Sequence, residues 1–255
     1  MDLLKKNPTF RGIEKDLEND YERTDCSTVH GVFGKTFILV GIAILGAVLA
    51  IAFLYNLTED NIGTFIGLLA ASLVVSLVAG LIANFSIRLC PVFSVAYCAS
   101  MGFMLGVISL IVELYYPGVA ISALIATFGV TIVMGILYFT GVIKVNHKFK
   151  AFIIASLIGI LVTGLISFAL AMAGFGQMDE LLHGDGVIGW LVSIFVVIIA
   201  ALSLCIDFDY AANIADMEAP KKYEWKAAFG LTVGIIYLYI RLLDLFLRIA
   251  AASKK

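Results

Sequence analysis

Long apolar runs separated by short polar stretches make up most of the chain. Seven of these runs are about 20 residues or longer, the length that an α-helix needs to cross the hydrocarbon core of a bilayer. They cover approximately residues 36–55, 62–85, 92–114, 118–141, 151–174, 186–207 and 227–249. The runs are apolar on every face and do not alternate with a period of two, so they predict helices and not the strands of a barrel. We therefore predict an all-α integral membrane protein with a bundle of seven transmembrane helices.

The composition supports this prediction. Apolar residues make up 62% of the 255 residues and charged residues only 14%, against roughly 25% charged residues in an ordinary soluble domain. The formal net charge is −2, and no basic patch is available to bind phosphates, so nucleic acid is excluded as a partner. The lipid bilayer is the first partner that the sequence implies.

Basic residues indicate the orientation, because short cytoplasmic loops retain lysine and arginine. Residues 1–35 carry six of them, and the loops on the same side carry seven more, whereas the three opposite loops carry none. The seven are Arg88, Lys144, Lys148, Lys150, Lys221, Lys222 and Lys226. We expect the amino terminus in the cytoplasm and, after seven spans, the carboxyl terminus outside.

Residues 1–35 lack the apolar core of a signal peptide. Phe10, Ile13, Leu17 and Tyr21 recur at spacings of three and four, which predicts an apolar stripe on a charged helix. We expect a cytoplasmic leader lying along the membrane surface, with partner docking as the alternative. The predicted organisation is leader 1–35, transmembrane domain 36–250 and tail 251–255.

Residues with the potential for metal or catalytic chemistry are scattered. Four cysteines and three histidines show no ligand spacing, and no nucleophile elbow, HExxH or phosphate-binding glycine loop occurs. We expect no enzymatic activity and no resident cofactor. The third run instead shows a packing signal: Ala99, Gly102, Gly106 and Ser109 share a face on which another helix can approach closely.

Several short motifs carry a family resemblance. They are Asn7-Pro8-Thr9-Phe10, Gly34-Lys35-Thr36, Tyr138-Phe139-Thr140-Gly141-Val142-Ile143 and, most specifically, the stretch from Asp207 to Gly230. Over about residues 7–248 the chain resembles the bacterial YccA-like branch of the Bax inhibitor-1 family. The resemblance implies a seven-helix protein of a bacterial inner membrane. The family is associated with calcium leak gated by pH through paired acidic residues, and some members modulate a membrane protease.

Ionisable residues within spans are costly to insert and are therefore functional candidates. Asp207 and Asp209 lie toward one end of the sixth run, and Arg241 and Asp244 lie within the seventh. At about 100° per residue the two aspartates of the sixth run point in nearly opposite directions. We select Asp207, the deeper one, as the pathway or gate residue and as a transient calcium ligand, with a helix-end or interface role as the alternative.

The partner of Asp207 stays open. In the family, an acidic partner follows a tyrosine and an aliphatic residue of the last helix, but here Tyr239-Ile240 precedes Arg241. The resemblance then implies a mixed pair of Asp207 and Arg241, with weaker proton gating than a carboxylate pair gives. Asp244, one turn further on, is another candidate partner, although Arg241 and Asp244 share a helix face and can form a local ion pair. A hairpin turn near 217–220 places Asp207 closer in depth to Glu224 or Lys226 than to Arg241, so Glu224 is the alternative partner.

Three functions are consistent with this sequence. The leading one is a passive or pH-modulated cation leak, with calcium as the ion because carboxylate oxygens suit a hard cation. The alternative is a non-conducting regulator that binds a membrane protease or another partner. An intramembrane enzyme built on Asp207 and Asp244 is the weakest, because neither residue lies in a catalytic motif.

Overall fold

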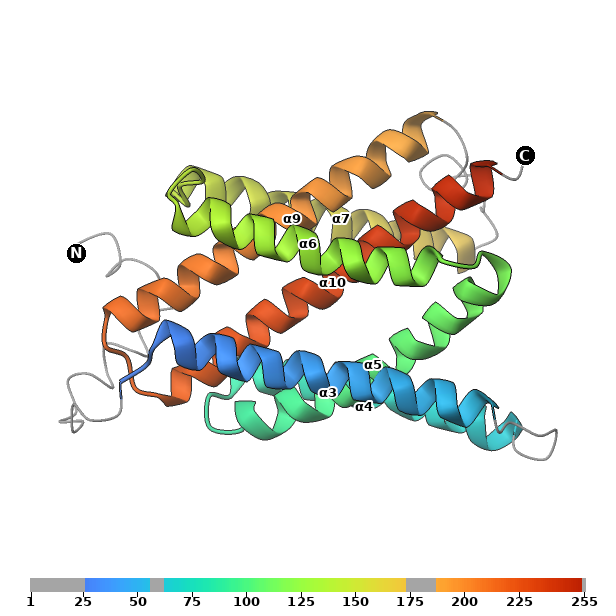
Figure 1. Ribbon diagram of the computed structural model, residues 1–255, viewed down its shortest axis with the longest axis horizontal. Coiled ribbons are helices and arrows are strands. Elements are labelled where there is room, and N and C mark those ends of the chain that lie inside the picture. Colours follow the sequence, from blue (N-terminus) through green and yellow to red (C-terminus); the bar gives the residue numbers. More distant parts are fainter. Residues whose placement is uncertain (1–25, 56–61, 173–186, 254–255) are drawn as a thin grey trace. The chain divides into compact units, whose positions relative to one another are not determined.

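A computed structural model describes residues 26–55, 62–172 and 187–253. Within these ranges seven helices are long and apolar enough to cross a membrane (Figure 1). They are α3 (Val29–Tyr55), α4 (Ile62–Phe85), α5 (Cys90–Tyr115), α6 (Val119–Phe139), α7 (His147–Met172), α9 (Val187–Asp216) and α10 (Lys222–Ser253). The prediction of an all-α protein with seven spans is confirmed.

Several helices extend beyond the apolar runs that predicted them. Helix α9 continues to Asp216 and α10 begins at Lys222, so charged residues occupy the helix ends on both sides of the turn between them. Long charged side chains at such positions can reach water while the backbone remains helical. Asp207, the last residue of the predicted run, consequently lies more than two turns inside α9.

The predicted leader falls mostly outside the described residues. Its apolar stripe at Phe10, Ile13, Leu17 and Tyr21 lies in that part of the chain, whereas residues 29–35 form the beginning of α3. The first span is therefore longer than the apolar run that starts at residue 36.

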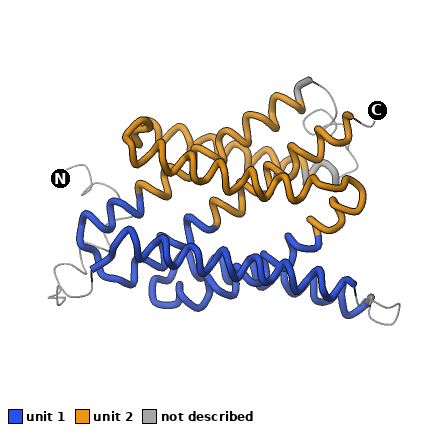
Figure 2. Tube along the Cα trace, in the orientation of Figure 1, with its two compact units in different colours: residues 1–107, 210–232 blue, residues 108–209, 233–255 orange. Residues whose placement is uncertain are grey.

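The chain divides into two compact units, shown in different colours in Figure 2. Unit 1 comprises residues 1–107 and 210–232, and unit 2 comprises residues 108–209 and 233–255. Each of the two long helices α9 and α10 contributes one segment to each unit.

Small residues bring α3 and α5 into close contact in unit 1. A Cβ atom added to Gly102 would overlap the backbone of Ala43, and one added to Gly106 would lie 2.5 Å from the carbonyl oxygen of Ala47. From the other side, a Cβ atom on Gly46 would lie 2.5 Å from the carbonyl oxygen of Ala99. Ala99, Gly102 and Gly106 of the predicted small-residue face are thus confirmed as a helix contact, and helices in a membrane associate through close packing of this kind. The fourth member, Ser109, instead shares a hydrogen bond of 2.6 Å with the hydroxyl of Tyr239 in α10.

We expect Gly102→Ala to lower the free energy of unfolding by about 1–3 kcal/mol, because the added methyl group meets backbone atoms that have no freedom to rotate away. Thermal unfolding in detergent measures the change. The matched control is Gly129→Ala in α6, where the added Cβ atom has nothing within 4 Å and alanine improves helix propensity. Equal stability changes for the two variants would contradict the close approach of α3 and α5.

In unit 2 an acidic side chain holds the turn between α5 and α6. The carboxylate of Glu113 accepts hydrogen bonds from the backbone amides of Gly118 (2.6 Å) and Ala120 (3.2 Å). Gly118 has a φ of 89°, which favours glycine. Glu113 therefore supplies the acceptor that the amino-terminal amides of α6 need, a structural role at the end of a span.

Candidate functional site

Asp207 lies on the side of α9 that faces α10 within unit 2. A Cβ atom added to Gly234 of α10 would lie 2.7 Å from Oδ2 of Asp207 and 2.9 Å from a methyl group of Leu204. The absence of a side chain at Gly234 thus leaves the space that the carboxylate occupies. Within the described residues, Asp207 takes part in no ion pair.

Asp209 points toward other helices and has polar partners. Its Oδ2 atom lies 2.5 Å from Nζ of Lys150 in α7, and its Oδ1 atom accepts a hydrogen bond of 3.3 Å from the hydroxyl of Tyr138 in α6. The prediction that Asp207 and Asp209 face different neighbours is confirmed. Asp209 connects α9 to α6 and α7, which is a structural arrangement.

The structure does not form the pair of Asp207 and Arg241 that the resemblance implied. Arg241 lies about two helical turns beyond Gly234, and its guanidinium group lies over the ring of Tyr237, 5.0 Å from the centroid. This is the geometry of a cation–π contact.

The local ion pair of Arg241 with Asp244 does not form either. Asp244 pairs with Arg248, at 3.3 Å between Oδ2 and Nε. Side chains three or four residues apart on a helix can contact each other. Asp244 could therefore pair with Arg241 or with Arg248, and it pairs with Arg248.

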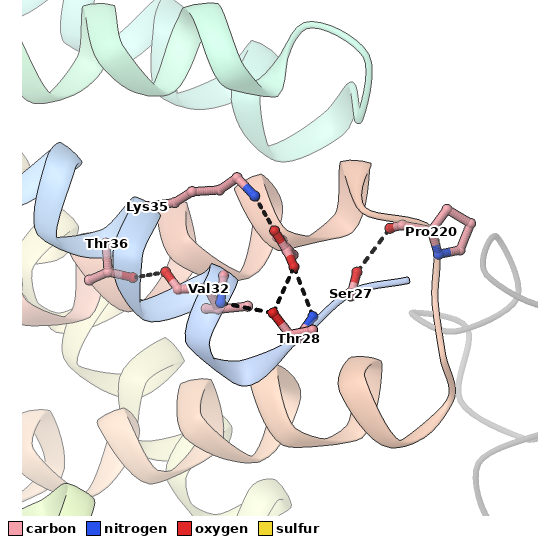
Figure 3. A network of polar contacts seen from close by, with 8 residues as sticks. Ser27, Thr28, Val32, Lys35, Thr36 and Pro220 are labelled. Atoms are coloured by element: carbon pink, nitrogen blue, oxygen red, sulfur yellow. Dashed lines mark hydrogen bonds and ion pairs between the residues drawn. The ribbon is translucent and has the colours of Figure 1, made fainter. Parts of the chain in front are cut away.

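Glu224, the alternative partner of Asp207, forms a different network at the start of α10. Its side chain is only 1% exposed and makes an ion pair with Lys35 of α3, whose side chain is 17% exposed. Its Oε1 atom accepts hydrogen bonds from the backbone amide of Thr28 (2.8 Å) and from the Thr28 hydroxyl (3.3 Å). Figure 3 shows Lys35 and Thr28 pointing toward this carboxylate. Glu224 is thus neutralised and hydrogen-bonded, as a buried charge requires.

Two neighbours complete the Glu224 network. The ammonium group of Lys35 also lies 5.6 Å from the ring centroid of Trp225, in the range of a cation–π contact. A Cβ atom added to Gly31 would overlap the carboxylate of Glu224. Only glycine at position 31 lets the first turn of α3 approach the carboxylate this closely.

The residues before α3 lie against the turn between α9 and α10. Cys26 and Pro220 form an isolated antiparallel bridge, and the amide of Ser27 donates a hydrogen bond of 2.7 Å to the carbonyl oxygen of Ala219. The Ser27 hydroxyl donates another, of 3.0 Å, to the carbonyl oxygen of Pro220 (Figure 3). Residues 26–28 are therefore attached to the α9–α10 turn by their backbone as well as through Glu224.

Several residues of these two sites were not predicted from the sequence. Gly234, Gly31, Thr28 and the pairing of Lys35 with Glu224 were not predicted, although Gly34-Lys35-Thr36 and Glu224 both lie in motifs that carry the family resemblance. The two charged residues were visible in those motifs, but no sequence pattern indicated that Lys35 and Glu224 form an ion pair.

A comparison with protein families matches the Bax inhibitor 1 like model over residues 7–251. That match covers nearly the whole chain. The chain belongs to the Bax inhibitor 1 like family. A search of curated proteins found no match. The family agrees with the seven long apolar helices and identifies a multi-pass membrane protein.

In this Bax inhibitor 1 like protein the two candidate carboxylates differ chemically. Glu224 carries a counter-ion and two hydrogen-bond donors within its own unit, whereas an oxygen of Asp207 lies in the space that Gly234 leaves open. No group of three or more histidine, cysteine, aspartate or glutamate side chains that could hold a metal ion occurs among the residues that the structure describes.

Proposed function

We propose that this protein is a passive or pH-modulated cation leak, with calcium as the ion and Asp207 on the pathway or gate. The observation that carries the proposal is a carboxylate inside a membrane-spanning helix, beside Gly234 and without an ion-pair partner in the described residues. Ionisable groups in such positions are costly and mark ion or proton pathways. Family membership supports the membrane setting, and the resemblance of the sequence motifs to this family suggests calcium as the ion.

The chemistry of the proposed leak is simple. A carboxylate oxygen is a hard ligand that suits calcium, and calcium takes six to eight oxygen ligands in flexible geometry. One aspartate with water can therefore hold the ion transiently without trapping it. The mechanism needs neither catalysis nor a resident cofactor. Protonation of Asp207 removes the charge that attracts the cation, so the leak should decrease when the medium is acidified.

The proposal also includes an orientation in a bacterial inner membrane. Lysine or arginine occurs in the loops 86–89, 140–146 and 217–221 and at the adjoining helix starts, so the positive-inside rule favours a cytoplasmic amino terminus and an external carboxyl terminus. In this orientation Glu224 and Lys35 lie toward the cytoplasmic side.

Calcium entry into proteoliposomes across about pH 5–8, the range in which a perturbed carboxylate titrates, tests the proposal. We expect a flux above that of empty vesicles, decreasing toward the acidic end. Arg241→Ala should have the same pH profile as the unaltered protein, because Arg241 contacts Tyr237 and does not pair with Asp207. No flux at any pH would refute the leak and favour a non-conducting regulator that binds a membrane protease or another partner.

A further inference from the structure

Residues 26–28 and the first two turns of α3 (residues 29–36) are together called the strap here. The strap contacts the α9–α10 hairpin in three ways. A backbone bridge joins Cys26 to Pro220. Hydrogen bonds join Ser27 to Ala219 and Pro220. An ion pair and two hydrogen bonds join the strap to Glu224.

Glu224 is the central residue of this attachment. Its side chain is 1% exposed. The carboxylate accepts a hydrogen bond from the amide of Thr28, near one end of the strap, and forms an ion pair with Lys35, near the other end. Loss of its charge would leave the Lys35 ammonium, mostly buried at 17% exposure, without a counter-ion. A buried ion pair that loses one partner is strongly destabilised. The charge of Glu224 therefore contributes to the attachment beside the contacts of Ser27 with the turn.

The attachment lies at the end of the hairpin that also carries the proposed pathway. Helix α9 contains Asp207, and α10, which begins at Lys222, contains Gly234. The strap holds the turn between these two helices and the first turn of α10. An attachment at this hairpin that can be made or broken would supply the bistable element through which a distant event changes function.

We propose that the strap is a releasable latch, locked by the Lys35–Glu224 ion pair, that restrains the α9–α10 hairpin and limits the leak. This inference rests on the proposed function. Release of the strap raises the calcium flux.

The test uses the full chain in proteoliposomes and two readouts. Glu224→Gln removes the charge and keeps an oxygen that can accept the Thr28 hydrogen bonds, and Lys35→Met is the second variant should the first fail to fold. The thiol of Cys26 reports on the strap, because it is half-exposed while Cys90, Cys98 and Cys205 are buried. Continued protection of the three buried thiols from maleimide shows that the spans remain folded. Lys148→Met, at an exposed lysine of α7, is the matched control for loss of one charge.

We expect Glu224→Gln to label faster at Cys26 and to raise the calcium flux by at least about fivefold, the lower end of typical coupling between sites, while Lys148→Met changes neither. If the unaltered protein conducts, either of two results for Glu224→Gln overturns the latch. One is faster labelling of Cys26 with unchanged calcium flux, and the other is unchanged labelling of Cys26. An unaltered protein without any flux refutes the proposed function and the latch with it. The flux of the unaltered protein therefore distinguishes failure of the proposed leak from failure of the latch.

Discussion

Glu224→Ala is expected to lower the free energy of unfolding by about 3 kcal/mol, one of the largest effects of a single side chain in this protein. The substitution removes a carboxylate that is 1% exposed and leaves both the Lys35 ammonium and the Thr28 amide without their acceptor. Lys35 keeps some access to water, so the lower end of the range for broken buried pairs applies. Thermal unfolding in detergent measures the loss.

A double-mutant cycle separates the ion pair from the packing around it. Lys35→Met keeps the aliphatic stem of the side chain and removes its charge, and the double variant with Glu224→Ala completes the cycle. We expect a coupling energy of about 1–3 kcal/mol. Asp216→Ala, at an exposed acid near the end of α9, should change stability by less than about 0.5 kcal/mol. Additive effects of the two substitutions at Lys35 and Glu224 would contradict the pair.

Gly234→Ala is expected to reduce calcium flux about tenfold, which corresponds to about 1.4 kcal/mol in the barrier. The new Cβ atom would lie 2.7 Å from Oδ2 of Asp207 and 2.9 Å from a methyl group of Leu204. The carboxylate must therefore move from the position in which the proposed pathway uses it. Flux into proteoliposomes at fixed protein density measures the effect.

The control for this prediction is Gly129→Ala in α6, a glycine in a span with open space around it. It should conduct as the unaltered protein does, because the added methyl group meets nothing within 4 Å. Normal flux from Gly234→Ala would show that the position of the Asp207 carboxylate beside α10 has no part in conduction.

The sequence predicted features that depend on local pattern. Apolar runs of sufficient length predicted the seven helices, and spacings of three and four predicted the small face at Gly102 and Gly106. The two-residue spacing of Asp207 and Asp209 predicted that they face different neighbours, as they do. All these features follow from the period of the helix, which needs no knowledge of tertiary contacts.

The missed features depend on how helices distant in the sequence are aligned. Lys35 and Glu224 are separated by 189 positions, and no pattern within one helix joins them. The alignment of α9 with α10 was not predicted either, because none of the candidate partners Arg241, Asp244 and Glu224 lies at the depth of Asp207, where Gly234 is found. Gly234 lies between the two candidates Glu224 and Arg241, and it is found only when the helices are packed together.

The most direct test of the central claim compares calcium entry into proteoliposomes for the unaltered protein, Asp207→Asn and Asp216→Asn. The two substitutions make the same chemical change on the same helix, but Asp216 is exposed at its end. The account predicts that Asp207→Asn falls close to the level of empty vesicles and loses its dependence on pH, while Asp216→Asn conducts normally. Undiminished, pH-dependent flux from a folded Asp207→Asn protein would contradict the assignment of Asp207 to the pathway or gate.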